Sequence, residues 1–261
     1  MQKIKLKGII RHVYKLAGRA INDYKMIGAG DRVLMCISGG KDSWSVYRVL
    51  SLRRQHLPVD FEIIPFIVDC GLAPEDIENL KDFFEKDGTD LVVKKLHITE
   101  TPENCFVCSW HKRKLYFETA KELGCAKIAT GHHLDDIVET ILMNMFLHGK
   151  ISSMCPSMKF FNGELELIRP FAYVSEDMVR EFFRQFVFPM PGYECVHNGT
   201  TRRSETKKTV SCLQDMFPDS DLRKNIFQAL KSENIKQSYL HDFDKPLDIR
   251  MIRGGKDKTC P

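Results

Sequence analysis

The sequence predicts an α/β protein in which a mostly parallel sheet carries helices on both faces. From residue 30 to about residue 150, short apolar runs alternate with longer segments of helical periodicity. This alternation is typical of parallel strands joined by crossover helices. The composition fits such a fold, because 43% hydrophobic and 28% charged residues in a chain of 261 allow one large core with an appendage.

The first expected element is a basic amphipathic helix over about residues 5–25. Apolar side chains recur there at helical spacing, with lysines and arginines on the other side. Seven Lys or Arg stand in the first 25 residues against one acidic residue, Asp23. Gly28 and Gly30 end the helix. We therefore predict a basic N-terminal helical extension over residues 1–29.

The α/β domain itself is expected over residues 30–188. Apolar runs predict strands at residues 32–36, 61–68, 91–96 and 126–129. Helical periodicity predicts helices at residues 43–55, 74–86, 109–123 and 133–147. Pro74 suits the first turn of its helix, Gly124 is a typical helix stop, and Pro65 counts against a regular second strand.

The alternation of strands and helices ends near residue 150. Residues 158–161 and 164–168 predict a hairpin around Asn162 and Gly163, and a helix is expected at residues 176–186. From residue 189 to residue 261 the sequence is first rich in loop-forming residues, then polar and helical, and it frays beyond Tyr239. We treat residues 189–261 as a C-terminal extension.

The sequence also excludes some classes of protein. The longest apolar runs, such as residues 33–37, fall far below the roughly 20 residues that a bilayer requires. Lysines stand near the N-terminus where a signal peptide would have its apolar stretch. Nine cysteines cannot all pair within the chain, and a reducing compartment would keep most of them as thiols. We therefore expect a cytoplasmic protein with no membrane partner.

The most informative segment follows the first expected strand and opens the next helix. It consists of Ser38, Gly39, Gly40, Lys41, Asp42 and Ser43. Two glycines permit a tight turn, and successive backbone N–H groups at a helix N-terminus form an anion site. The hydroxyls and the lysine add donors, and Asp42 offers a carboxylate for Mg²⁺. The pattern predicts a phosphate-binding loop, although its spacing is not that of a Walker loop.

Two further segments are expected at the same edge of the sheet, because ligands of open parallel sheets bind beyond the carboxyl ends of the strands. Asp69 follows the second strand, and Gly131 follows the fourth. Asp135 and Asp136 suit capping of the next helix, and both roles can hold, with one aspartate capping and the other reaching the site. For the two histidines between them and Gly131, packing or phosphate contact is favoured over a metal.

Cys105 and Cys108 form a C-x-x-C pair just before a helix that is expected to begin near Ser109. The dipole of that helix and the basic residues 111–114 favour the thiolate form. Such a pair suits a redox couple, half of a zinc site or part of an iron–sulfur site. A zinc ribbon would need a second C-x-x-C, which the sequence lacks.

A third, distant cysteine would allow a cluster to be held through three irons, with the fourth iron open. Cys195 is the candidate, because it stands in a loop-forming segment beyond the α/β region and before a basic segment. The other six cysteines, Cys70 among them, have no partner at metal-ligand spacing. We expect these six to be buried or incidental thiols.

These segments occur in an order that resembles a known family. The loop at residues 38–43 resembles the signature of the PP-loop ATP pyrophosphatases, and the similarity extends through residues 23–27, 30–33, 130–140 and 169–174. With the C-x-x-C pair included, the set is similar to the tRNA 2-thiocytidine synthetases, the TtcA group of the TtcA/TtuA thiolases. The similarity covers about residues 8–210.

The resemblance implies a Rossmann-like PP-loop fold and an ATP-dependent tRNA sulfurtransferase. ATP with Mg²⁺ would adenylate the C2 oxygen of a tRNA cytidine and release pyrophosphate. Sulfur delivered through a [4Fe-4S] cluster on Cys105, Cys108 and Cys195 would then replace that oxygen. The resemblance also implies catalytic roles for Lys112 and Asp136.

The resemblance implies tRNA, ATP and a sulfur donor such as a cysteine desulfurase as partners. A homodimer is a possible assembly. The basic first helix and a second basic segment would track the phosphate backbone of the RNA. The second segment contains Arg202, Arg203, Lys207 and Lys208.

Three alternatives remain open from the sequence. One is thiolation of another tRNA base, of the 2-thiouridine type, because residues 196–203 differ from the Cys-Gly-Ser-rich segment of the longer bacterial synthetases. Another is a cluster-free PP-loop ligase of the amide or lysidine type. The last is a non-enzymatic module that senses ATP or redox state.

Overall fold

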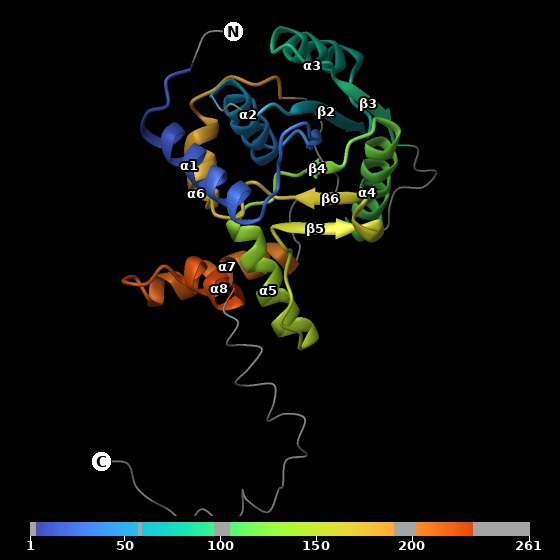
Figure 1. Ribbon diagram of the computed structural model, residues 1–261. Coiled ribbons are helices and arrows are strands. Elements are labelled where there is room, and N and C mark those ends of the chain that lie inside the picture. The colour runs from blue at the N-terminus through green and yellow to red at the C-terminus, as the bar shows by residue number, and fades with distance from the viewer. Residues whose placement is uncertain (1–3, 57–58, 97–104, 191–201, 232–261) are drawn as a thin grey trace, which may run out of the picture.

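The computed structural model describes residues 4–56, 59–96, 105–190 and 202–231. Its centre is a six-stranded sheet in the order β3-β2-β1-β4-β6-β5 (Figure 1). The strands are β1 (Arg32–Ile37), β2 (Glu62–Asp69), β3 (Val92–Lys95), β4 (Lys127–Ala129), β5 (Ser157–Phe160) and β6 (Leu165–Ile168). All neighbouring strands are parallel except β5 and β6. The mostly parallel α/β class predicted from the sequence is confirmed.

Helices connect and cover these strands. They are α1 (Gly8–Asp23), α2 (Lys41–His56), α3 (Pro74–Lys86), α4 (Cys105–Glu122), α5 (Leu134–His148), α6 (Glu176–Phe183), α7 (Arg202–Met216) and α8 (Leu222–Lys231). In Figure 1, α7 and α8 lie beside α5, at the end of the molecule away from α3. Among the described residues, no helix combines the length and the apolarity needed to cross a membrane.

The central strand β1 faces two apolar layers because its side chains alternate. Val33, Met35 and Ile37 join the larger core, which also takes buried side chains from α1, α2, α3, α5 and α6. Leu34 and Cys36 join a smaller core on the other face, which is completed by side chains of α4. Helices therefore lie on both faces of the sheet, as predicted.

Three local predictions differ from the structure. α4 begins at Cys105 rather than near Ser109, so the C-x-x-C pair forms the first turn of the helix instead of preceding it. The hairpin of β5 and β6 is found as predicted, but β6 also pairs in parallel with β4, which carries the sheet past residue 150. Pro65 fits in β2 because pairing with β3 starts only at Phe66, so no ladder bond with β3 is required at Pro65.

The basic helix α1 is packed into the main core rather than standing apart. Val13, Ala17 and Ala20 are fully buried. At the end of the helix the Tyr173 hydroxyl donates to Asp23 Oδ2 at 2.8 Å, which joins two segments far apart in the sequence. The limits predicted at residues 29 and 188 remain predictions.

Candidate active site

The phosphate loop is closed by the hydroxyl of Ser43. Ser43 Oγ accepts from the backbone N–H of Ser38 at 3.1 Å and donates to the Gly40 carbonyl at 2.9 Å. Gly39 has a φ of +83°, a conformation that favours glycine. Because α2 begins at Lys41, the loop presents backbone N–H groups and the positive end of a helix dipole to the same space. This geometry suits the anion site expected from the sequence, and binding of ATP by the loop residues stays a prediction.

The loop lies where the strand order reverses. β1 has β2 on one side and β4 on the other, so the connections after β1 and β4 emerge side by side at the carboxyl edge of the sheet, where ligands of open parallel sheets bind. Gly131, just after β4, packs on the loop: a Cβ at this position would lie 2.6 Å from Ser43 N and 2.9 Å from Ser43 Cα. Only glycine permits this approach of two backbones. The structure thus brings together the loop and Gly131, as predicted.

Asp69 stands at the same edge, at the end of β2. β2 is hydrogen-bonded to β1, with Ile67 opposite Ile37, so Asp69 lies near the start of the phosphate loop. Its Oδ1 accepts from the N–H groups of Gly71 and Leu72 at 2.8 and 2.7 Å. The Asp69 carboxylate therefore shapes the turn after β2. Its role toward ATP stays a prediction.

Asp42 has the chemistry of a magnesium ligand. Its Oδ1 atom is buried and has no hydrogen-bond partner, although Lys41 Nζ lies 3.1 Å away as an ion partner. Mg²⁺ is commonly held by one or two carboxylates together with substrate phosphates. A buried carboxylate oxygen beside the phosphate loop fits that requirement.

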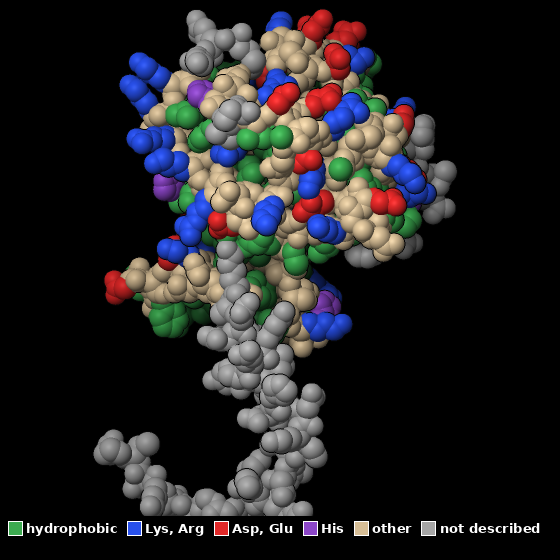
Figure 2. Space-filling model, viewed as in Figure 1, with side chains coloured by type: hydrophobic (Ala, Val, Ile, Leu, Met, Phe, Trp, Pro, Cys, Tyr) green, Lys and Arg blue, Asp and Glu red, His purple; other side chains and the backbone are tan. Residues whose placement is uncertain are grey.

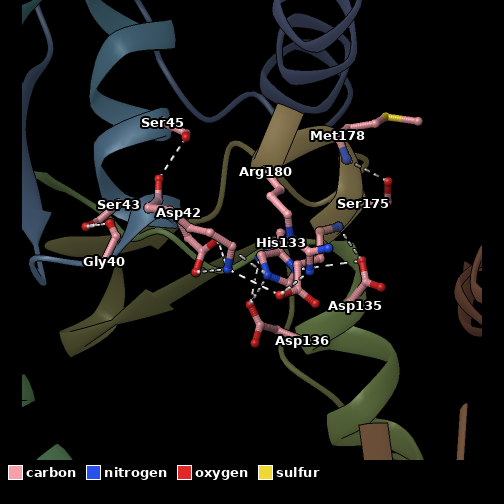
Figure 3. Close-up of polar contacts among 12 residues, drawn as sticks. Gly40, Asp42, Ser43, Ser45, His133, Asp135, Asp136, Ser175, Met178 and Arg180 are labelled. Carbon is pink, nitrogen blue, oxygen red and sulfur yellow. Dashed lines mark hydrogen bonds and ion pairs between the residues drawn. The ribbon is translucent and has the colours of Figure 1, made fainter. Parts of the chain in front are cut away.

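The imidazole of His133 lies among three carboxylates (Figure 3). Its Nε2 is 3.8 Å from Asp42 Oδ1 and 3.5 Å from Asp136 Oδ2, and its Nδ1 is 3.7 Å from Asp135 Oδ2. His133 is also the N-cap residue of α5, and its backbone N–H donates to Asp136 Oδ2 at 3.0 Å. Among the described residues, no group of three His, Cys, Asp or Glu side chains is arranged to hold a metal ion. The expectation that the two histidines serve in packing or phosphate contact stays a prediction.

Asp136 links the sheet edge to the C-terminal helices. Arg203 of α7 places Nη1 3.0 Å from Asp136 Oδ1 and Nε 3.9 Å from Glu139 Oε2. Both oxygens of Asp136 thus have a partner. Arg203 and Lys207 were predicted to follow an RNA backbone, but in the structure both pair with carboxylates of the chain itself.

Several charged residues of this region were not singled out from the sequence. Glu176 contacts Lys41 and Lys207, and Arg223 Nε lies 2.6 Å from Asp135 Oδ1. These pairs join residues that are distant in the sequence, so no local sequence motif predicts them. The only available signal was the basic character of the segment after residue 201.

A second group of side chains surrounds the C-x-x-C pair. The charge of Lys112 and the thiol of Cys108 both influence the ionisation of the Cys70 thiol. Burial raises the pKa of Cys70, with Lys112 opposing the change. Cys70 thus shares the electrostatic surroundings of Cys108 and Lys112, and the expectation that it is a buried or incidental thiol stays a prediction.

The other predicted cluster ligands are described less fully. The backbone of Cys105 forms the start of α4, and Cys108 is half-buried within the same turn. Cys195 lies outside the described residues. Thiols at a helix N-terminus, next to a lysine, suit thiolate ligation.

Comparison with known proteins adds to this geometry. Residues 13–188 match the PP-loop domain family. The chain is 38% identical over 239 residues to the tRNA-cytidine(32) 2-sulfurtransferase of Ralstonia nicotianae, which covers 87% of this chain and 75% of that protein. It is 35% identical over 244 residues to the protein of the same name from Burkholderia ambifaria, with 90% and 70% covered.

A solved structure has a similar fold. It is the U34-tRNA thiolase NcsA from Methanococcus maripaludis with its [4Fe-4S] cluster. It matches with a TM-score of 0.68 and 20% identity, over 88% of this chain and 80% of that chain. At this identity the likeness concerns the fold alone.

The close approach at Gly131 predicts the effect of a single methyl group. In Gly131→Ala, the new Cβ would push the loop away from Ser43, at a cost of about 1–3 kcal/mol in the free energy of unfolding, and ATP binding should weaken because the phosphate loop moves. Urea denaturation and ATP titration measure both. Gly28→Ala is the matched control, because a Cβ there lies 3.7 Å from its nearest neighbour. Equal behaviour of the two variants would contradict this account.

Glu139 predicts a pH dependence of stability. Burial and the charge of Asp136 raise the pKa of Glu139 to about 7, against the opposing charges of Arg203 and Lys207. The folded state therefore holds a proton that the unfolded state releases near its ordinary value of 4.5, so stability falls as the pH rises through this window. Glu139→Gln should remove the loss, which amounts to at most about 3 kcal/mol.

The measurement is the difference in unfolding free energy between Glu139→Gln and the unaltered protein, taken by urea denaturation from about pH 5 to about pH 8. The difference should grow in favour of the variant as the pH rises. Glu181→Gln, at an exposed position of α6, serves as the control. A difference that is constant across this range would show that Glu139 does not titrate as described.

Proposed function

Because the chain belongs to the tRNA-cytidine 2-sulfurtransferase family of PP-loop proteins, and is therefore an ATP-binding tRNA sulfurtransferase, we propose that it adenylates the C2 oxygen of a tRNA cytidine and exchanges that oxygen for sulfur. The relatives from Ralstonia and Burkholderia are named for cytidine 32. We propose the same nucleotide as the target here.

The observation that carries the proposal is that the phosphate loop and the C-x-x-C pair share one edge of the sheet. The loop follows β1, and the pair opens the helix that follows β3. Cys70, at the end of β2, lies between these regions and close to Cys108, and β2 is hydrogen-bonded to β1. A nucleotide on the loop and sulfur held by the thiols would therefore lie at the same edge of the sheet, with the end of β2 between them.

The adenylation step uses the loop and its charges. The backbone N–H groups of residues 38–43 bind the phosphates, Lys41 supplies a positive charge, and Asp42 would hold Mg²⁺. The C2 oxygen of the cytidine attacks the α-phosphate, an O–P bond forms, and pyrophosphate leaves. This converts a poor leaving oxygen into a good one. Gly131 packs against the phosphate loop on the side of β4 and so fixes the position of the loop.

The sulfur step would require a group that the three cysteines hold. The donor set of Cys105, Cys108 and Cys195 suits a [4Fe-4S] cluster, because thiolates are its usual ligands. When bound, such a cluster with one open iron supplies sulfide as an anion at neutral pH. Addition of sulfur at C2 breaks the C–O bond, and AMP leaves.

Two further residues take roles from the family resemblance. Lys112 lies one turn after Cys108 and beside Cys70, where its charge would stabilise the phosphate oxygens as AMP leaves. Asp136 has both carboxylate oxygens occupied, by its own helix cap and by Arg203. For Asp136 to act on the substrate, its carboxylate must contact the substrate while it remains paired with Arg203, or Arg203 must release it.

A surface for tRNA is available on α1. Lysines and arginines gather over α1 in Figure 2. Arg11, Lys15 and Arg19 of α1 are exposed, as are Lys5 and Lys7 just before the helix. A row of cations along one helix suits a phosphate backbone. Because α1 packs into the main core, RNA bound there would be held in a fixed relation to the phosphate loop.

Family membership removes two of the alternatives raised by the sequence, the cluster-free ligase and the non-enzymatic sensor. Thiolation of another base remains an outcome that the experiment distinguishes. The cysteine desulfurase as sulfur donor, the homodimer and the cytoplasmic location stay predictions from the sequence.

The test is anaerobic reconstitution with iron and sulfide, followed by incubation with ATP and bulk tRNA. Thionucleosides are then identified by mass spectrometry. The proposal expects 2-thiocytidine, with one AMP and one pyrophosphate for each sulfur inserted. Appearance of 2-thiouridine without 2-thiocytidine would overturn the substrate, and inorganic phosphate with ADP would overturn the chemistry.

Removal of single thiols gives a sharper prediction. Cys105→Ala, Cys108→Ala and Cys195→Ala should each lower the yield of 2-thiocytidine by at least about 100-fold, the scale of losing a group that acts in the transition state. Cys212→Ala, at an exposed position on α7, should leave the yield unchanged. Full activity of any of the three ligand variants would remove that cysteine from the proposed set.

A further inference from the structure

One carboxylate joins two lysines that come from distant parts of the chain. Lys41 of the phosphate loop places Nζ 3.2 Å from Glu176 Oε1, and Lys207 of α7 contacts the other oxygen, Oε2. Arg180, one turn further along α6, lies 3.5 Å from Oε1. The two lysines thus lie on opposite sides of one small anionic group, the Glu176 carboxylate.

The surroundings of Glu176 favour an anion strongly. Burial opposes its ionisation, but the hydrogen bond from Lys207 and the charges of Lys41 and Lys207 prevail, and the pKa of Glu176 falls to about 2. The Glu176 side chain is 13% exposed. The position between the two lysines is therefore a nearly buried site with the positive charge that a doubly or triply charged group requires.

Lys207 differs from the arginines of this region. Arg203 is held by Asp136 and also approaches Glu139, and Arg223 is held by Asp135. The ion pair of Lys207 in the described part of the chain is with Glu176, and its side chain is 50% exposed. Lys207 is therefore able to exchange its carboxylate partner for another anion without moving α7.

We propose that Lys207 is a phosphate-binding residue of the nucleotide site, and that the terminal phosphates of ATP replace the Glu176 carboxylate between Lys41 and Lys207. The inference rests on the proposed adenylation step, because it needs a polyphosphate on the loop. Lys41 belongs to that loop, and the two lysines are separated only by the Glu176 carboxylate. A phosphate group bound by Lys41 in place of that carboxylate would therefore also reach Lys207. Pyrophosphate, the leaving group, would bind to the same two lysines.

A plain structural ion pair is the competing explanation. In that case Lys207 and Glu176 only fasten α7 to α6, and breaking the pair from either side has the same consequence. A phosphate-binding Lys207 predicts opposite consequences. Loss of Lys207 removes a ligand of the polyphosphate, whereas loss of the Glu176 charge removes the group that competes with it.

The experiment measures binding of inorganic pyrophosphate and of α,β-methylene ATP, which cannot be cleaved at the reacting bond, by calorimetry on the full chain. Lys207→Gln should weaken both by about 10-fold, the scale of one charge-assisted hydrogen bond. Lys207→Arg should retain most of the affinity, AMP binding should change little, and Glu176→Gln should strengthen pyrophosphate binding. Lys208→Gln is the matched control, at an exposed position next along α7.

Two results would overturn the inference: unchanged pyrophosphate affinity in Lys207→Gln, or equal weakening in Lys207→Gln and Glu176→Gln. Failure of the unaltered protein to bind α,β-methylene ATP would overturn it together with the proposed adenylation. The expected binding pattern supports it even if the tRNA assay yields 2-thiouridine, since that result would change only the substrate of the proposed function. Thermal unfolding of each variant shows whether the fold is intact.

Discussion

The candidate site depends on the contact between Gly131 and the first turn of α2. No side chain fits between these backbones, since a Cβ would fall 2.6 Å from Ser43 N. The contact holds the connections after β1 and β4 together at the point where the strand order reverses. It therefore fixes the direction in which the N–H groups of the phosphate loop point. Every later step in the proposed chemistry assumes that direction.

Around this contact, the N-termini of α5 and α6 carry carboxylates that form ion pairs with cations of the C-terminal helices. Asp136, Asp135 and Glu176 pair respectively with Arg203, Arg223 and Lys207. Buried carboxylates without such partners would be costly, so α7 and α8 complete the site electrostatically as well as covering α5. α7 also follows Cys195 closely in the sequence. In the proposed function, nucleotide and sulfur chemistry would therefore draw on the same C-terminal part of the chain.

Local patterns were enough to predict much of this from the sequence. The glycine loop after an apolar run, the expected strands and helices before residue 150 and the hairpin at Asn162 each follow from short-range periodicity and turn chemistry. The start of α4 was missed because residues 105–108 have no helical signal of their own. The neighbours of Cys70 and the partners of Arg203 and Lys207 were missed because they are set by how separate elements pack. Ion pairs with Asp136 and Glu176, rather than burial, bring Arg203 and Lys207 of the basic segment beside the candidate site.

The most direct measurement of the central claim follows the oxygen atom of the base. In a single turnover carried out in ¹⁸O-labelled water, AMP should carry no solvent oxygen, because its new oxygen comes from C2 of the cytidine. With ¹⁸O placed at C2 of the tRNA cytidine instead, the label should appear in AMP. One solvent oxygen in each AMP, with none transferred from the base, would show that ATP is hydrolysed without adenylating the cytidine and would contradict the account.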